Sequence, residues 1–166
     1  MDQIVIGADD PRSADARALL EAHLAFAALH SPPEDVHALD VDRLLSPDVT
    51  FFGVREAGTL LGVGALRQIG PTHVEIKSMH TGEGARGRGV GRLMLDHLLA
   101  VARHRGCVRV SLETGSMAAF APARALYSSA GFVPCPPFAD YPHSRNSICI
   151  TLELGLDDGA GAHQNG

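Results

Sequence analysis

The sequence has few cysteines, no long apolar segment and no excess of positive charge, and each shortage excludes a class of protein. The three cysteines, Cys107, Cys135 and Cys149, are an odd number without paired spacing, which argues against a disulfide framework and a zinc site. No apolar run approaches the ~20 residues that a membrane-spanning helix needs. Residues 1–6 carry no basic group, so we expect no secretory signal. A reducing cytoplasm is the expected location.

The balance of charge limits the expected partners. Fourteen basic and 19 acidic residues give a net charge of −5, which does not favour nucleic-acid binding, because such binding depends on neutralising many phosphates. The basic residues are unevenly spread, since six arginines lie between Arg86 and Arg109 against one acid, Asp96. We interpret this segment as a local anion site or as a solvated helix face. The expected partner is a small molecule, with no nucleic acid and no membrane, and a homodimer is left open.

The order of the predicted elements indicates a single α/β domain over residues 1–154, followed by a disordered tail over 155–166. Hydrophobic periodicity and turn residues predict strands over residues 4–8, 50–55, 59–66, 73–81, 108–112, 132–133 and 147–154, and helices over 13–30, 90–105 and 122–130. We expect residues 34–45 to form a short helix or an ordered loop. A meander followed by a strand–helix–strand unit implies a mixed sheet with helices on both faces and one parallel, right-handed crossover.

A glycine-rich segment, residues 81–91, joins a predicted strand to a predicted helix. Its five glycines let the backbone turn tightly and direct successive N–H groups at one spot. The helix N-terminus adds a partial positive charge there. We expect a phosphate or pyrophosphate at this loop; a merely flexible loop would not explain the two arginines between its glycines.

Two familiar phosphate-binding motifs do not account for this loop. Residues 82–87 satisfy the G-x-G-x-x-G dinucleotide pattern, but no acidic residue lies between Asp96 and Glu113, where the ribose-binding acid would fall. A Walker A loop needs Gly-Lys-Ser/Thr, and this sequence is absent.

The loop instead resembles that of the GNAT acetyltransferases. Arg86-Gly87-Arg88-Gly89-Val90-Gly91 matches the R/Q-x-x-G-x-G/A motif that opens the central helix of that family. Residues 123–132, Ala-Arg-Ala-Leu-Tyr-Ser-Ser-Ala-Gly-Phe, resemble the later A-x-x-L-Y-x-x-x-G-F segment. Residues 112–141 are also similar to a bacterial subgroup of small GNAT proteins. Together the two motifs are specific, although either alone would not be.

The resemblance implies a GNAT-like fold, with a mostly antiparallel sheet and one parallel strand pair at the cofactor site. It implies transfer of an acetyl group from acetyl-CoA to a primary amine, by direct attack and without a metal. We expect the acceptor to be a small molecule or amino acid rather than a protein, because no appended recognition domain accompanies the predicted one. The backbone near Met79 and Thr81 would meet the pantetheine and the thioester carbonyl. The residues expected to contact acetyl-CoA are Met79, His80, Thr81, Arg86, Gly87, Arg88, Gly89, Val90, Gly91 and Arg92.

The resemblance also suggests catalytic residues. Tyr127 lies on the helix that faces the thiol in the family, where a phenol can protonate the leaving thiolate; the alternative is a packed aromatic residue. Glu75 is a candidate base, or else it pairs with Lys77 or an arginine, and Glu113 is a second candidate base. His37 falls in the region that borders the acceptor site and is expected to contact the acceptor.

Three further expectations complete the interpretation. Strand alternation predicts Glu75, Lys77 and Met79 on one face, with Val74 and Ile76 on the other. The position seven residues before the tyrosine, often Asn in the family, holds Phe120, which removes one side-chain contact to the cofactor. The alternative to an enzyme is a non-catalytic acyl-CoA-binding or regulatory module.

The nine histidines invite a metal hypothesis. His97 and His104 could share a helix face, but the sequence has no HExxH motif or Cys/His cluster. We therefore interpret both as histidines of the helix surface.

Overall fold

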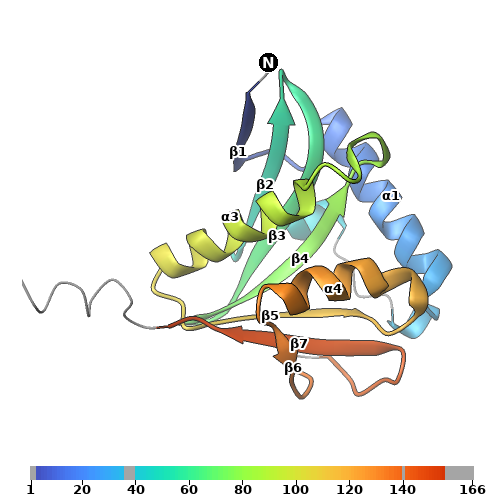
Figure 1. Ribbon diagram of the computed structural model, residues 1–166, viewed down its shortest axis with the longest axis vertical. Helices are drawn as coiled ribbons and strands as arrows, with labels where there is room; N and C mark the ends of the chain where they lie inside the picture. Colours follow the sequence, from blue (N-terminus) through green and yellow to red (C-terminus); the bar gives the residue numbers. More distant parts are fainter. Residues whose placement is uncertain (1–2, 36–39, 140, 156–166) are drawn as a thin grey trace, which may run out of the picture.

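A computed structural model describes residues 3–35, 40–139 and 141–155 of the chain. Its elements follow the predicted order (Figure 1). The strands are β1 (Ile4–Ala8), β2 (Val49–Glu56), β3 (Thr59–Gly70), β4 (His73–Thr81), β5 (Arg109–Gly115), β6 (Val133–Pro134) and β7 (Ser147–Glu153). The α-helices are α1 (Ala14–His30), α2 (Val41–Leu44), α3 (Val90–His104) and α4 (Ala121–Ser129), with short 3-10 helices η1 (Pro33–Asp35), η2 (Glu83–Ala85) and η3 (Ala118–Phe120). The expected tail lies outside the described residues, apart from its first residue.

Two strands are longer than local periodicity predicts, because pairing with a neighbouring strand extends them. The ladder between β3 and β4 continues to the pair Gly70–His73, beyond the expected end at Leu66. The ladder between β5 and β7 continues to the pair Gly115–Ser147. Cross-strand hydrogen bonds, rather than the composition of either strand alone, decide where these strands end.

The strands form one seven-stranded sheet in the order β1-β2-β3-β4-β5-β7-β6. Its strand pairs are antiparallel except for β4 and β5, which are parallel. The crossover between these two strands passes through α3. The sheet therefore has the predicted mixed topology with one parallel pair.

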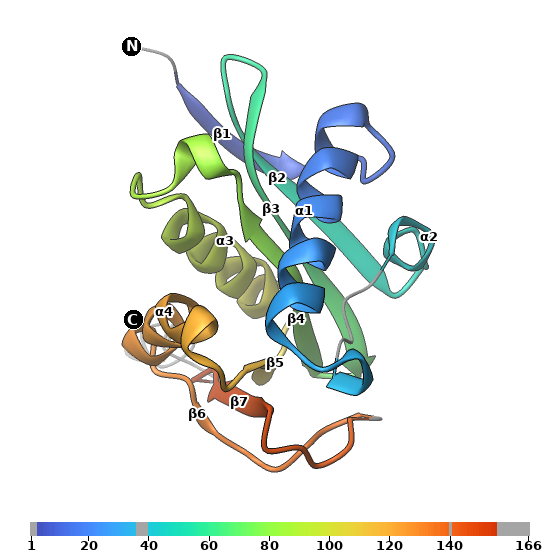
Figure 2. The ribbon, with the colours of Figure 1, turned by 90° about the vertical axis from the view of Figure 1, so that its right-hand side faces the viewer.

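Helices cover both faces of the sheet, as expected (Figure 2). One buried cluster lies beneath α3 and α4, and the α3 residues in it recur at helical spacing: Val90, Met94, Leu95, Leu98, Leu99 and Ala102. A second, smaller cluster packs α1 and α2 against the opposite face: Ala16, Leu20, Leu44, Phe51, Val63 and Ala65. Burying a side chain such as Leu98 stabilises the fold by about 1.5–3 kcal/mol, so these two layers hold the sheet between them.

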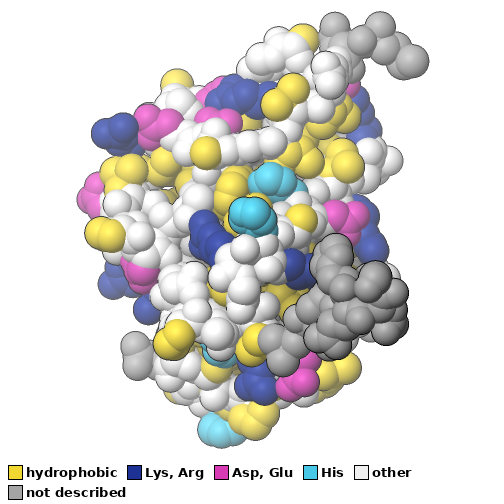
Figure 3. Space-filling view, turned by 90° about the vertical axis from the view of Figure 1, so that its left-hand side faces the viewer, with side chains coloured by type: hydrophobic (Ala, Val, Ile, Leu, Met, Phe, Trp, Pro, Cys, Tyr) yellow, Lys and Arg dark blue, Asp and Glu magenta, His cyan; other side chains and the backbone are white. Residues whose placement is uncertain are grey.

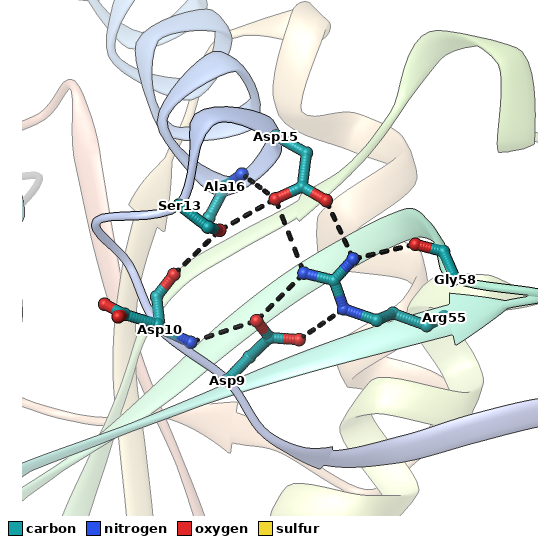
Figure 4. A network of polar contacts seen from close by, with 7 residues as sticks. All are labelled: Asp9, Asp10, Ser13, Asp15, Ala16, Arg55 and Gly58. Carbon is teal, nitrogen blue, oxygen red and sulfur yellow. Dashed lines mark hydrogen bonds and ion pairs between the residues drawn. The ribbon is translucent and has the colours of Figure 1, made fainter.

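An ion-pair network joins strand β2 to the connection before α1 and to the first turn of α1 (Figure 4). The Arg55 guanidinium donates to Asp9 through Nε at 2.8 Å and to Asp15 at 2.7 Å, and it also donates to the Gly58 carbonyl at 2.9 Å. A Cβ added at Gly53 would collide with the Asp9 carboxylate. The network therefore requires glycine at this position of β2.

Charge is mixed over the surface that Figure 3 presents. On this face, the basic and acidic side chains of the described residues lie interspersed among apolar and neutral ones, so their fields largely offset one another. Within the described part of the chain, no helix combines the length and the apolar character needed to cross a membrane.

Candidate active site

The sheet opens where β4 and β5 separate. The two strands pair only over His73–Glu75 and Arg109–Ser111. Beyond that point β5 stays paired with β7, whereas β4 stays paired with β3. A cavity of about 460 Å³ lies at the opening, between the ends of the two strands, the C-terminal half of α1 and the start of α4.

A bulge in β4 shapes the wall of this cavity. Lys77 pairs with Ala65 and His80 pairs with Val63, so two residues of β4 stand opposite the single residue between Val63 and Ala65. The extra residue is Ser78, whose φ of 57° lies in the left-handed region. The bulge shifts the alternation of all later β4 side chains by one residue.

The predicted position of Met79 on the face of Glu75 and Lys77 is therefore wrong. Met79 packs against the cluster beneath α3, close to Met94. His80 instead turns to the α1 side, where its ring lies edge-on to His23 with centroids 5.4 Å apart. Burial lowers the pKa of both imidazoles, that of His23 to about 4, so both rings are neutral at pH 7.

The bulge residue itself carries an unsatisfied group. Ser78 is 6% exposed, and its buried Oγ has no hydrogen-bond partner in the described part of the chain. A buried hydroxyl without a partner costs about 1–3 kcal/mol, and a left-handed non-glycine residue adds strain. Such costs gather at functional sites, and Ser78 lines the cavity.

The glycine-rich loop forms one end of the cavity. Gly87 and Gly89 have φ values of 79° and 78°, and a Cβ added at either would meet no heavy atom within 4 Å. Gly89 is the N-cap of α3, and the first-turn N–H groups of a helix have no partner within that helix. Arg86 and Gly91 line the cavity beside it. Open space, unpaired donors and a guanidinium suit a phosphate group.

The ten residues expected to contact the cofactor are not all brought together. Five line the cavity: Met79, His80, Thr81, Arg86 and Gly91. Arg88 extends to β2 and pairs with Glu56 at 2.9 Å. Arg92 turns toward α4 and donates to Ser129 at 3.0 Å. Val90 is 2% exposed and belongs to the core. Some residues of the motif therefore pack in the core or pair with residues distant in the sequence, and others shape the loop beside the cavity.

Tyr127 faces the cavity from α4. It is 6% exposed, and its ring lies edge-on to Phe132 with centroids 5.7 Å apart. Burial raises the pKa of the phenol well above its usual range, so the hydroxyl keeps its proton at neutral pH. Both sequence interpretations of Tyr127, proton donor and packed aromatic, are compatible with this position.

Phe120 lines the cavity at the start of α4. A Cβ added at Gly115 would collide with its ring, and the ring lies edge-on to Phe26 of α1 at 5.3 Å. Arg124 holds the chain before Phe120 by donating to the carbonyls of Gly115 and Met117 at 2.7 and 2.8 Å. Phe120 therefore closes the cavity with an apolar wall, at the position that is often Asn in the family that the sequence resembles.

The two candidate bases occupy different positions. Glu113 lines the cavity, whereas Glu75 does not and is fully buried. Glu75 accepts a hydrogen bond from the Tyr141 hydroxyl and lies 3.8 Å from Lys77 Nζ and 3.5 Å from Arg67. Burial raises the pKa of Glu75. Glu75 therefore pairs with Lys77 and with an arginine, Arg67, which is the alternative to a base that the sequence left open.

The sequence analysis did not identify every residue at or beside the cavity. Lys77 was considered only as a neighbour of Glu75 on the same strand face and as its possible partner, and His23, which lines the cavity, was not considered. Neither was a role for Tyr141, which lies behind the cavity wall and contacts Lys77 and Glu75. No local signal marks Tyr141, because its contacts join residues 64 and 66 positions apart. His37 lies outside the described residues.

The expectation for the two α3 histidines is wrong for His97. Its ring packs edge-on against Phe52 at 4.8 Å, and burial lowers its pKa. No group of three His, Cys, Asp or Glu residues in the described segments is placed to hold a metal.

Comparison with known proteins gives consistent matches. Residues 16–132 match the sequence model of the acetyltransferase (GNAT) family. The chain is 44% identical to the uncharacterized N-acetyltransferase YsnE of Bacillus subtilis (strain 168), covering 88% of this chain and 97% of that protein. It is 46% identical to the uncharacterized N-acetyltransferase YedL of Escherichia coli (strain K12), covering 90% and 98%. A candidate acyl-CoA N-acyltransferase from Klebsiella pneumoniae superposes with a TM-score of 0.78 at 27% identity, covering 92% and 99%.

Proposed function

This chain belongs to the GNAT family of acetyltransferases, and from that premise we propose that it moves an acetyl group from acetyl-CoA to a primary amine of a small molecule or amino acid. One observation carries the proposal: the cavity at the β4–β5 opening joins the glycine-rich loop to the α1 side of the sheet. A thioester entering from the loop and an amine entering from α1 would meet there. Proteins of the same fold, from Elizabethkingia anophelis and Bacillus subtilis, are described with acetyl-CoA and CoA bound.

The loop would hold the phosphates of acetyl-CoA. The α3 N-terminus, the open backbone at Gly87 and Gly89 and the Arg86 side chain offer donors and positive charge in one place. Arg88 would contribute by leaving Glu56, since that pair is exposed and such pairs are worth only about 0–1 kcal/mol.

The reaction would use backbone N–H groups of β4, the Tyr127 hydroxyl and the Glu113 carboxylate. The backbone of β4 beyond Glu75 is not paired with β5, and its N–H groups near Met79 and Thr81 would donate to the oxyanion that forms on the carbonyl. Removing one such donor typically costs about 2.7–4 kcal/mol. The amine nitrogen bonds to the carbonyl carbon, the carbon–sulfur bond breaks, and Tyr127 protonates the thiolate that leaves.

The acceptor amine would lose its proton to Glu113, directly or through a water. Glu113 lines the cavity, whereas Glu75 lies behind Lys77. We therefore assign the base to Glu113 and a positioning role to Glu75, which holds Lys77 and Tyr141.

The decisive experiment is turnover with a panel of primary amines, read as CoA release and as N-acetylated product by mass spectrometry. We expect acetylation of small amines or amino acids. Acetyl-CoA binding without turnover of any acceptor would contradict the proposal and favour a non-catalytic acyl-CoA-binding module. The matched controls are reactions without enzyme and without acceptor.

A further inference from the structure

We propose that the acceptor is a zwitterionic amino acid with an apolar side chain, whose carboxylate is bound by Lys77 and whose ammonium group is bound by Glu113. The inference rests on the proposed acetyl transfer. It names the substrate class for the α1 side of the same cavity.

Strand register brings this cation and this anion to opposite sides of the opening. The last pair between the two parallel strands joins Glu75 to Ser111. Two residues further along each strand are Lys77 and Glu113, on the same face of their strands as that pair. Both line the cavity. A ligand between the separated strands therefore meets a positive group from β4 and a negative group from β5.

Lys77 is held in place before any ligand arrives. Its side chain is 8% exposed, and its Nζ donates to the Tyr141 hydroxyl at 2.5 Å and lies 5.1 Å from the centre of the Tyr141 ring. Burial lowers the pKa of Lys77, while the carboxylates of Glu75 and Glu113 offset part of that effect. A substrate carboxylate at Nζ would stabilise the ammonium form further. A preorganised buried cation of this kind suits recognition of a carboxylate.

The surrounding charges favour a ligand that carries a carboxylate. Among the described residues that interact with Lys77 electrostatically, Arg67 and Arg43 are positive, and Glu75 and Glu113 are negative. With Lys77 itself, three positive charges therefore stand against two negative ones. A substrate carboxylate at Lys77 offsets this excess while the substrate ammonium group pairs with Glu113, whereas a simple alkylamine only adds positive charge.

The walls beside these two groups are apolar. Phe26 and Ala27 of α1 and Phe120 at the start of α4 line the same cavity, and the two phenyl rings lie edge-on at 5.3 Å. His23 adds a neutral ring. The acceptor side chain is therefore expected to be apolar or aromatic rather than charged.

The first test uses the wild-type protein and matched acceptors. L-phenylalanine, L-phenylalaninamide and phenethylamine share one apolar body, but only the first has a carboxylate; L-leucine, L-leucinamide and 3-methylbutylamine form a second set. We expect kcat/KM for the amino acid to exceed that of its amide and amine by about ten- to a hundredfold, the value of one charge-assisted hydrogen bond. Equal or better turnover of the amides and amines would overturn the inference and leave acetyl transfer standing. Failure of every acceptor would instead overturn the proposed function.

The second test asks whether Lys77 supplies this preference. In Lys77→Met, the ratio of kcat/KM for amino acid to matched amine should fall by about ten- to a hundredfold, and Lys77→Arg should restore part of it. Arg67→Met is the matched control, because it removes a neighbouring cation that does not line the cavity; its ratio should stay within about threefold of wild type. An unchanged ratio in Lys77→Met would refute the assignment. If Lys77→Met fails to fold, the wild-type preference and the Lys77→Arg ratio decide.

Discussion

Replacing Tyr127 by Phe removes one hydroxyl group and keeps the ring. The side chain is 6% exposed and packs edge-on to Phe132, so we expect the melting temperature to change little. If the hydroxyl protonates the departing thiolate, kcat should fall by about 10²- to 10⁴-fold, which corresponds to about 2.7–5.4 kcal/mol of transition-state stabilisation. The KM for acetyl-CoA should change little, because the ring still forms the same wall.

The assay is the initial rate of thiol release at saturating acetyl-CoA and acceptor, from pH 6 to pH 10. Burial raises the pKa of Tyr127 above its usual 10.0, so the phenol stays protonated and competent as an acid throughout this range. Wild-type activity should therefore show no alkaline loss from this residue. Phe132→Leu is the matched control: it disturbs the ring contact and should lower thermal stability while kcat stays within about threefold. A Tyr127→Phe enzyme with near-normal kcat would refute the acid role and leave Tyr127 as a packed aromatic residue.

Four other predictions follow from the same structure. Glu113→Gln should lower kcat/KM at neutral pH, and the activity of this variant should recover above about pH 9, where more of the acceptor is free amine. Glu75→Gln should keep the wild-type shape of the pH–rate profile. The reverse pattern would assign the base to Glu75. Gly89→Asp should abolish CoA binding by calorimetry, while Gly106→Asp, at the other end of α3 with a φ of 79° and equally open space, should retain it; equal affinities would contradict the phosphate site. Gly53→Ala should lower the free energy of unfolding by about 1–3 kcal/mol by displacing Asp9 from Arg55, and Gly7→Ala, its cross-strand partner with no atom within 4 Å of the added Cβ, should change it far less. Hydrogen bonds from Arg55 and Ser13 lower the pKa of Asp15 to about 2, so the stability that Asp15 contributes is present above pH 4 and is lost as the pH falls from 4 to 2. Because the side chain is 44% exposed, Asp15→Asn should reduce the pH dependence of the free energy of unfolding, measured by urea titration, by at most about 1 kcal/mol. An unchanged loss of stability between pH 4 and pH 2 in this variant would contradict the pairing.

Local pattern determined the elements of this fold. The bounds of β1 and β4 agree with those predicted from apolar runs and turn residues, and α3 begins at Val90 as its motif predicts. These features depend on the period of the hydrophobic residues and on glycine and proline at the ends. Each can be evaluated within a window of a few residues.

The loop motif could also be recognised within a short window of sequence, but the contacts of its side chains could not. Gly87 and Gly89 adopt the left-handed backbone that a tight turn requires. Whether Arg88 faces a ligand or Glu56, a residue 32 positions earlier, depends on how β2 packs beside α3. The sequence therefore identified Arg88 as a residue of the loop but did not identify its partner.

The site itself was decided by tertiary structure. Simple alternation assigned Met79 to the wrong face, because the bulge at Ser78 exists only in the pairing of β4 with β3. Lys77 and Glu113 flank one opening only because two strands run parallel for three residue pairs and then separate. Periodicity within one strand determines which side chains share a face, but pairing between strands determines where that face ends and what it meets across the gap. Those contacts join residues distant in the chain, and no local window contains both partners.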